Sequence, residues 1–409
     1  MKRKVYIFNG TSRAAAYGIG TYIKQLTDAL KETDIEYEVV HLYSKGNEVT
    51  ITEEAGYKQI SIPAVASTVK DSAKYYQRNI AYLLQDLIPK EKDTYYIFHL
   101  NFVTNPDLVS ILKKMFKCKV ITTVHYTNWS FALLGNQQKL REILTKRKLD
   151  CSEKNIRKGI KVDKKMLGKS DSFICVAQHT LDSFNDICGI DIAKGILINN
   201  ALEDIYTPLS FDEKTAIRQK YSIPEETKII IFAGRLDEVK GLRFLIPAYK
   251  EVLKTNPDTH LFIAGDGDFN SWLSEAKNDW VKITFTGKLD KEQLYELYSI
   301  ADIGIAPSLH EEFGYVAIEM MMHEIPLLVT DTGGLAEIVE DGVSGLKVPV
   351  QNEGDKRTID TTAMADKIKL LLDNEDYAKE LGSSGRLRFL EKYELGLFKA
   401  KMIDLYSSI

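Results

Sequence analysis

The chain has 409 residues, of which 44% are apolar, so it can fill the cores of two or three domains of about 150 residues each. This composition excludes a disordered or fibrous protein. No apolar run approaches the roughly 18 residues of a membrane span, so we expect a soluble, cytoplasmic protein. The four cysteines have no CxxC spacing, and three lie in or beside apolar runs. Buried, reduced thiols are therefore expected rather than a disulfide or a metal site.

The net charge of −4 is unevenly distributed along the chain. Residues 1–200 carry 30 basic and 21 acidic side chains, whereas residues 201–409 carry 24 and 37, which gives +9 and −13. Residues 139–169 alone hold twelve Lys and Arg against four acidic residues. A solvated helix face would explain this segment, and so would contact with an anionic membrane or a diphosphate-bearing acceptor. Nucleic acid is not expected, because the segment does not interleave aromatic with base-reading side chains.

In the first half of the chain, short β-branched apolar runs alternate with helical patterns. The expected strands are 5–9, 36–43, 95–101, 120–125 and 172–177, and the expected helices are 19–32, 72–87 and 106–116. Strands that are apolar on both faces are typical of a parallel sheet covered by helices on both sides. This half is therefore predicted to be a doubly wound α/β domain.

The second half repeats the plan. The expected strands are 229–233, 260–264, 283–286, 303–306 and 326–330, and the expected helices are 242–253, 291–300, 313–323, 336–340 and those from residue 362 onward. Residues 351–361 are predicted to form a loose polar loop. A break near 200–227 separates the halves, so we expect domains at 1–205 and 206–394, with a terminal helix at 395–409.

The loop after the expected strand 303–306 is rich in polar residues. Ligands of open parallel sheets bind beyond the carboxyl ends of the strands. Glu311 lies in this loop and Glu319 follows in the next helix, so the two carboxylates could bind hydroxyls at both ends of an elongated ligand. The helix start between them would attract an anion. Two glutamates beside a helix start are also ordinary capping charges.

Two cations follow the expected strand 229–233. Arg235 follows it after Gly234, and Lys240 opens the next helix. A lysine at a helix N-terminus opposes the helix dipole, so Lys240 is either splayed into water or lies beside an anion. The fork of Arg235 and the compact charge of Lys240 together suit a pyrophosphate.

Glycines follow several strands of the second half, among them Gly265, Gly287, Gly333 and Gly334. They would let a ligand approach the backbone closely, although tight turns at strand ends would show the same pattern. Residues 266–268 have the form of a metal-binding DxD pair, and we interpret them as a turn.

The first half offers weaker signals. Gly18 and Gly20 form a G-x-G loop before a helix, as in a phosphate cradle. This loop lacks a third glycine and the acidic residue expected after the second strand, which argues against a dinucleotide cofactor. His125 ends an expected strand and would face the same crevice, or it is a structural residue.

Together these motifs resemble the retaining glycosyltransferases of family 4, whose GT-B architecture has two doubly wound, Rossmann-like domains facing a central cleft. The resemblance covers nearly the whole chain and is strongest over 228–350. Residues 232–241 are similar to the family's donor-phosphate motif, and residues 307–319 to its paired-glutamate motif. Residues 332–346 also match in order and spacing, whereas the first half matches more loosely, through Gly18, Gly20, His125 and residues 199–201.

The resemblance implies transfer of a sugar from a nucleoside diphosphate sugar, UDP-linked, to an acceptor hydroxyl held by the first domain. It implies retention of the anomeric configuration and a place in surface glycan or glycoconjugate synthesis. By this analogy, Arg235 and Lys240 neutralise the leaving diphosphate, Glu319 binds the ribose and Glu311 binds the donor sugar. No metal or other cofactor is implied, because the two cations and helix dipoles would replace it.

The resemblance also supplies the rest of the donor site. Residues Phe313, Gly314 and Tyr315 would complete the sugar pocket, with Gly265 and Gly287 close to the donor, while Gly18, Gly20 and His125 would close over it. The terminal helix would cross back to the first domain. Because the acceptors of such enzymes are often lipid-linked, residues 139–169 would place the protein at the inner membrane face.

Three residues depart from the family pattern. Glu312 stands where the family has glycine, Tyr126 where an acidic residue often follows the histidine, and Glu324 where the family has another glycine. Glu312 and Glu324 leave the identity of the donor sugar open. A phosphorylase or epimerase of the same architecture, or a catalytically silent relative that binds a sugar nucleotide or a partner, are the alternative functions.

Overall fold

The computed structural model describes residues 2–10, 18–54, 56–64, 72–101, 106–354 and 356–409. The chain divides into two compact units. The first unit comprises Met1–Leu133, Gln137–Asn200 and Leu395–Ile409, and the second comprises Leu134–Asn136 and Ala201–Glu394. The expected boundary after residue 205 therefore falls inside the second unit. Within the described ranges, no helix is long and apolar enough to cross a membrane.

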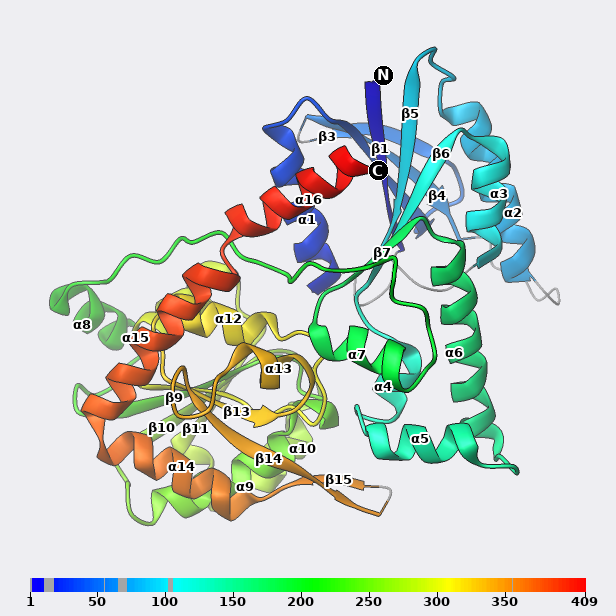
Figure 1. Cartoon of the computed structure of the whole chain (residues 1–409). Coiled ribbons are helices and arrows are strands. Elements are labelled where there is room, and N and C mark those ends of the chain that lie inside the picture. Colours follow the sequence, from blue (N-terminus) through cyan, green and yellow to red (C-terminus); the bar gives the residue numbers. More distant parts are fainter. Residues whose placement is uncertain (1, 11–17, 55, 65–71, 102–105, 355) are drawn as a thin grey trace. The chain divides into compact units, whose positions relative to one another are not determined.

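The described part of the first unit contains one eight-stranded sheet in the order β3-β4-β2-β1-β5-β6-β7-β8 (Figure 1). Its strands are β1 (Lys2–Gly10), β2 (Glu36–Ser44), β3 (Thr50–Glu54), β4 (Tyr57–Pro63), β5 (Thr94–Leu100), β6 (Cys118–Val124), β7 (Ser172–Cys175) and β8 (Gly195–Leu197). All adjacent strands are parallel except β3 and β4. The five predicted strands of this half are confirmed to within a few residues. Strands β3, β4 and β8 were not predicted, because β3 is a polar edge strand and β8 has three residues.

Helices cover both faces of this sheet. They are α1 (Gly18–Lys31), α2 (Ser72–Leu87), α3 (Pro106–Met115), α4 (Asn128–Ala132), α5 (Gln137–Thr145), α6 (Cys151–Lys169), α7 (Gln178–Asp186) and α16 (Leu395–Ser408). Helices α2 and α3 bury Leu84 and Leu112 against Phe8 and Phe98 of the strands. On the opposite face, Nδ1 of His99 on β5 lies 2.5 Å from the hydroxyl of Tyr406 on α16, so the terminal helix is part of this unit.

The described part of the second unit contains a seven-stranded sheet in the order β11-β10-β9-β12-β13-β14-β15. Its strands are β9 (Lys228–Ala233), β10 (Thr259–Ala264), β11 (Ile283–Gly287), β12 (Ile303–Ala306), β13 (Leu327–Asp331), β14 (Leu346–Glu353) and β15 (Lys356–Ile359). The prediction of a polar loop at 351–361 is wrong, because β14 and β15 form an antiparallel hairpin there. An edge hairpin keeps much of its surface in water, so it lacks the apolar run by which the inner strands were recognised.

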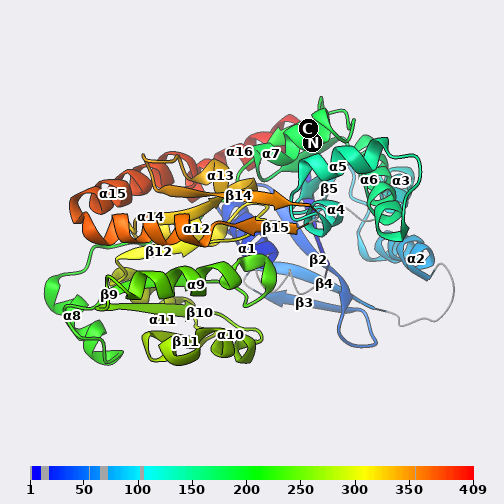
Figure 2. The ribbon, with the colours of Figure 1, turned by 90° about the horizontal axis from the view of Figure 1, so that it is seen from below.

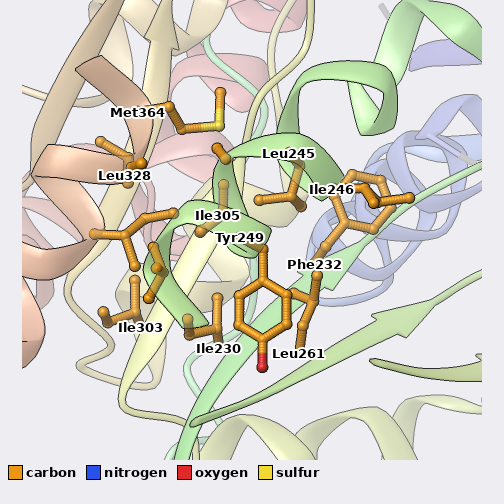
Figure 3. Close-up of a cluster of buried hydrophobic side chains, with 14 of the residues drawn as sticks. Ile230, Phe232, Leu245, Ile246, Tyr249, Leu261, Ile303, Ile305, Leu328 and Met364 are labelled. Atoms are coloured by element: carbon orange, nitrogen blue, oxygen red, sulfur yellow. The ribbon is translucent and has the colours of Figure 1, made fainter. Parts of the chain in front are cut away.

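The described helices of the second unit are α8 (Phe211–Lys220), α9 (Leu242–Leu253), α10 (Phe269–Ala276), α11 (Lys291–Ser299), α12 (Tyr315–Met322), α13 (Gly333–Ile338), α14 (Thr361–Asp373) and α15 (Glu375–Lys392). They pack on both faces of its sheet, apart from α8, which buries no residue and contacts α11. Helices α9 and α14 lie side by side on one face (Figure 2). Figure 3 shows the core beneath them, where Leu245 and Tyr249 of α9 and Met364 of α14 meet Ile230 and Ile305 of the strands. Burial of each such side chain contributes roughly 1.5–3 kcal/mol.

Both sheets have a point at which the strand order reverses. In the second unit, β10 and β11 extend from one side of β9, and β12 and β13 extend from the other. The reversal lies between β9 and β12, and the corresponding reversal in the first unit lies between β1 and β5. Such switch points leave a crevice beyond the carboxyl ends of the strands, which is where ligands of doubly wound sheets bind.

Candidate functional site

The switch point of the second unit brings Lys240 and Glu311 into contact. Lys240 ends a short 3-10 turn after β9, and Glu311 lies in the loop after β12. The ammonium of Lys240 donates to Oε2 of Glu311, which also accepts from the hydroxyl of Ser308 at 3.3 Å. The two charged side chains are 18% and 23% exposed, so both remain within reach of a ligand. Lys240 was expected either to extend into water or to lie beside an anion. The structure shows the second arrangement, and the anion is the carboxylate of Glu311.

Gly241 makes this contact geometrically feasible. Its φ is 78°, and a Cβ atom there would lie 1.8 Å from the carbonyl oxygen of Pro307. The backbone N–H of Leu309 donates to the carbonyl of Val239 at 2.7 Å. Only a residue without a side chain lets the loops after β9 and β12 pack this closely, and their contact places Lys240 beside Glu311.

Arg235 has a different carboxylate partner from Lys240. It follows β9 by two residues, and its Nη2 lies 3.1 Å from Oδ2 of Asp237. Its side chain is 31% exposed. Both predicted cations therefore lie in the loop after β9, each paired with a carboxylate that an incoming diphosphate could displace.

Glu319 is held in a more buried setting. Helix α12 begins at Tyr315, two residues later than expected, so Glu319 lies just beyond its first turn. Nζ of Lys291, at the start of α11, lies 3.0 Å from Oε1 of Glu319 and 3.1 Å from the hydroxyl of Tyr295. Burial raises the pKa of the Glu319 carboxyl, and the nearby ammonium of Lys291 offsets this only in part.

Lys291 was missed in the sequence. It occupies the first position of α11, where its charge opposes the helix dipole as that of Lys240 does. The argument applied to Lys240 would therefore have found it. Desolvation opposes the charge of Lys291, but Glu319 and Tyr295 outweigh this effect and raise its pKa.

The glycines at strand ends let loops pack on one another. A Cβ atom at Gly265 would lie 1.7 Å from the carbonyl oxygen of Gly234, and one at Gly334 would lie 2.1 Å from that of Phe313. Gly265 and Gly334 are therefore required by loop packing, whatever they do for a ligand. Gly287 differs, because nothing lies within 4 Å of the Cβ position there.

The remaining expected residues of this unit lie near the same strand ends. Gly314 precedes α12, and the buried ring of Phe313 packs edge-on against Tyr315 at a centroid distance of 5.6 Å. Residues 266–268, which were interpreted as a turn, form an irregular segment after β10 in which Gly267 forms a β-bridge with Leu236 and the carbonyl of Asp266 accepts from Leu236 N–H at 2.9 Å. Among the described residues, no group of three or more His, Cys, Asp or Glu could hold a metal ion.

The structure gives local reasons for two departures from the family pattern. Glu324 has a φ of 61°, a left-handed conformation that favours glycine and costs other residues roughly 1 kcal/mol. Its Oε1 accepts from the hydroxyl of Ser383 at 2.6 Å. Glu312 is turned toward the buried ring of His310, whose Nε2 lies 3.4 Å from its Oε2.

The first unit places its expected site residues as follows. Gly18 and Gly20 lie in the first turn of α1, so the prediction that they form a loop is wrong, and residues 11–17 before them lie outside the described residues. His125 directly follows β6, with its Nε2 3.1 Å from Oδ1 of Asn101 and its ring packed edge-on against Tyr22. Desolvation lowers the pKa of His125 to about 3, so this imidazole is neutral.

The basic segment 139–169 forms α5 and α6 and the turn between them. Some of its cations have local partners: Nζ of Lys146 lies 2.8 Å from Glu153, and Nζ of Lys165 lies 3.2 Å from Asp107. Four exposed lysines of α6 have no ion pair within the described ranges. They are Lys154, Lys158, Lys161 and Lys164.

Comparison with known proteins shows what the second unit is similar to. Residues 213–388 match the sequence model described as glycosyl transferases group 1. These matched residues all lie in the second unit. An uncharacterized glycosyltransferase of Methanocaldococcus jannaschii, MJ1607, is 35% identical over 147 residues, which are 35% of this chain and 37% of that relative. The matched region thus spans little more than a third of that relative's length.

Solved structures extend the likeness to the whole chain at the level of fold. Sucrose-phosphate synthase from Thermosynechococcus elongatus has a TM-score of 0.76 and 20% identity, covering 100% of this chain and 99% of that one. Anabaena Alr3699/HepE, solved in complex with UDP and glucose, has a TM-score of 0.70 and 14% identity, covering 99% of each chain. The chain therefore has the GT-B fold, as the resemblance implied.

Proposed function

We propose that the chain is a retaining glycosyltransferase that moves a hexosyl group from a UDP-linked donor to an acceptor hydroxyl, in glycan or glycoconjugate synthesis. The observation that carries the proposal is the pairing of Lys240 with Glu311 at the switch point of the second unit's sheet, within the residues that match the group 1 glycosyl transferase model. A nucleoside diphosphate sugar offers phosphate oxygens to the cation and hydroxyls to the carboxylate, so it can replace both halves of the ion pair. The complex of HepE with UDP and glucose supports the choice of donor.

The residues of the loop after β9 would act on the leaving group. As the bond between the sugar and the diphosphate breaks, negative charge grows on the departing phosphate oxygen. Lys240 and Arg235 are held at the end of one strand by separate carboxylates, and would neutralise that charge without large rearrangement. With two cations there, we propose that the reaction needs no metal ion or other cofactor.

The residues of the loop after β12 and of α12 would hold the donor. Glu311 would accept hydrogen bonds from hydroxyls of the sugar, with Phe313, Gly314 and Tyr315 lining the sugar pocket and Gly265 and Gly287 close by. Glu319 would accept from the ribose hydroxyls. Because Glu319 is buried beside Lys291, its hydrogen bonds would form away from bulk water, where they are stronger.

The exposed lysines of α6 support a further part of the proposal, which is reversible contact with an anionic membrane carrying a lipid-linked acceptor. Each basic residue near such a surface contributes about 1 kcal/mol. Lys154, Lys158 and Lys161 are spaced to lie on one face of a helix, and that face is solvent-exposed.

A nucleotide-release assay tests the activity. The purified chain is incubated with a panel of sugar nucleotides and alcohol acceptors, with EDTA present, and released UDP is measured while proton NMR reports the anomeric configuration of the product. We expect one UDP-sugar to turn over with retention and to raise the unfolding temperature, since a ligand at 100 times its Kd adds about 2.7 kcal/mol of stability. Tight binding of a UDP-sugar without turnover would instead favour a silent sugar-nucleotide-binding relative.

A further inference from the structure

Two asparagines flank the switch point of the first unit's sheet. Asn9 is the penultimate residue of β1, and Asn101 directly follows β5. Phe8 of β1 is paired with Leu100 of β5, and the N–H of Asn101 donates to the carbonyl of Phe8 at 3.1 Å. Asn9 and Asn101 are therefore neighbours across the strand pair, with backbones about 4.8 Å apart.

Both side chains belong to one face of the sheet. Side chains alternate along a strand, so Asn9 shares a face with Ile7, and Asn101 shares one with His99. His99 is bonded to Tyr406 of α16 and packs edge-on against Tyr22 of α1. Oδ1 of Asn101 meets His125, whose ring also packs on Tyr22, so this pair lies on the face covered by α1 and α16.

Each asparagine has a buried polar atom without a hydrogen-bond partner in the described chain. Asn9 is 7% exposed and its Oδ1 is unpartnered, while Asn101 is 1% exposed and its Nδ2 is unpartnered. Buried polar groups are nearly always hydrogen-bonded, and leaving them unpaired costs stability. One strand end thus carries an unused acceptor and its neighbour an unused donor.

We propose that Asn9 and Asn101 form a subsite for a hydroxyl group of the sugar acceptor, which donates to Oδ1 of Asn9 and accepts from Nδ2 of Asn101. The inference rests on the proposed transferase function and adds the acceptor-binding residues. A hydroxyl is the group that both donates and accepts, whereas a phosphate dianion can only accept and would leave Asn9 unpaired. The neutral ring of His125 beside the pair likewise suits an uncharged ligand.

Weak binding of simple sugars tests the subsite directly. The probes are the methyl glycosides of glucose, galactose and mannose, together with glycerol, measured by saturation-transfer NMR on the full chain with saturating UDP. At least one probe should bind the native protein, and its signal should fall at least fivefold in Asn9→Leu and in Asn101→Leu. Glu311→Gln separates the two sugar sites, since a probe seated in the donor pocket would lose its signal in that variant and keep it in the asparagine variants.

The unfolding temperature is a second measurement. If Asn9 and Asn101 only stabilised the fold, their replacement would lower this temperature. Leucine replaces the unpartnered amide oxygen of Asn9 with a methyl group on a side chain of the same branched shape, so Asn9→Leu should unfold at the same temperature as the native chain or higher. The matched control is Thr122→Val, which removes a buried hydroxyl bonded to Ser170 at 2.8 Å and should lower the unfolding temperature while leaving the probe signal unchanged.

The outcomes separate this inference from the proposed function. Failure of every probe to bind, unchanged probe signals in both asparagine variants, or loss of stability in both would overturn the acceptor subsite. UDP should stabilise the native chain and both asparagine variants equally. If UDP stabilises none of them, the proposed transferase function fails instead, whatever the probes do.

Discussion

The ammonium of Lys240 contacts the carboxylate of Glu311, so the two strands that flank the switch point of the second sheet place opposite charges together. Neither side chain is fully buried, and each charge has a complementary group in a nucleoside diphosphate sugar. In the ligand-free chain, this ion pair keeps both side chains oriented. Because Lys240 and Glu311 would bind different parts of the donor, mutation of each residue tests its role separately.

Lys240→Ala should lower transfer by roughly two to three orders of magnitude at saturating donor, comparable to the loss of one preorganised transition-state donor. The fold should persist, because Lys240 lies on a surface loop. UDP release is measured alongside the circular dichroism spectrum. Arg243→Ala is the matched control, since it removes an exposed cation from α9 that is paired with Glu238. Native turnover in Lys240→Ala would contradict its assignment to the phosphates.

Glu311→Gln and Glu319→Gln should each reduce activity far more than Glu312→Gln. The first two replace carboxylates assigned to the donor's hydroxyls, whereas Glu312 is turned toward His310. Glu312→Gln should therefore act mainly on the unfolding temperature. Turnover and thermal unfolding are measured for all three variants. If Glu312→Gln proves the most damaging to turnover, the assignment of the loop is shifted by one residue.

Lys291→Met should weaken UDP binding about tenfold, and by a larger factor at acidic pH. Burial already raises the pKa of Glu319, and removal of the adjacent cation would raise it further. As pH falls from 8 to 5, Glu319 would then become protonated earlier in the variant and lose its charge toward the ribose hydroxyls. Calorimetric titration with UDP across this pH range gives the ratio of the native affinity to the affinity of the variant. Lys254→Met, which removes an exposed lysine paired with Glu251, should leave the ratio near one at every pH.

Asp163→Asn should stabilise the protein at neutral and alkaline pH. Asp163 of α6 is buried, and desolvation raises the pKa of its carboxyl from 3.8 to about 7, although the Trp129 indole donates to it at 2.8 Å. Because the folded-state pKa is above the unfolded one, stability falls as pH rises from about 4 to 7, and asparagine removes this loss. The pKa rises by about three units at roughly 1.36 kcal/mol each, so the gain at pH 8 should exceed that at pH 4 by up to about 4 kcal/mol.

Asp171→Asn is the control, because the pKa of Asp171 is shifted in the opposite direction to that of Asp163. Burial opposes the charge of Asp171, but Lys113 and the backbone N–H of Val120 outweigh it and lower the pKa of this carboxyl. Its contribution to stability is therefore present above the unfolded pKa near 4 and lost in acid. Urea unfolding of both variants at pH 2, 4, 6 and 8 should show Asp163→Asn gaining stability relative to the native chain between pH 4 and 8. Asp171→Asn should be destabilising by a nearly constant amount above pH 4, and this destabilisation should disappear in acid. Parallel pH profiles would contradict the assignment of Asp163.

The exposed face of α6 should bind anionic vesicles at low salt. Charge reversal of Lys154, Lys158 and Lys161 should abolish cosedimentation, and 0.5 M salt should weaken that of the native chain, because the Debye length then falls to a few ångströms. Lys146 is a poor choice for this test, since it pairs with Glu153 of the α6 capping box. Lys254→Glu, at an exposed lysine of the second unit that is paired with Glu251, is the control. Equal binding to neutral and anionic vesicles would contradict the prediction and mean that these lysines form an ordinary solvated face.

Much of the architecture could be predicted because the inner strands are buried on both faces. Such strands appear as continuous β-branched runs, and helices such as α9 (Leu242–Leu253) carry their own apolar periodicity, so both were found to within a few residues. The unfavourable position of Lys240 relative to the helix dipole could likewise be recognised from the neighbouring sequence alone. The β14–β15 hairpin was missed because an edge strand needs no apolar run, and the glycines at 18 and 20 were assigned to a loop although they lie in the first turn of α1.

The sequence by itself determined which residue types follow which strands, and hence that cations and carboxylates gather at one edge of the second sheet. Only the tertiary structure decided how they pair: Lys240 with Glu311, Arg235 with Asp237, and Lys291 with Glu319. It also decided that Asn9 and Asn101 become neighbours with unused polar atoms. The physical reason is that local patterns specify the burial of each element, whereas contacts between loops depend on strand order and on the close backbone approach that Gly241 and Gly265 permit.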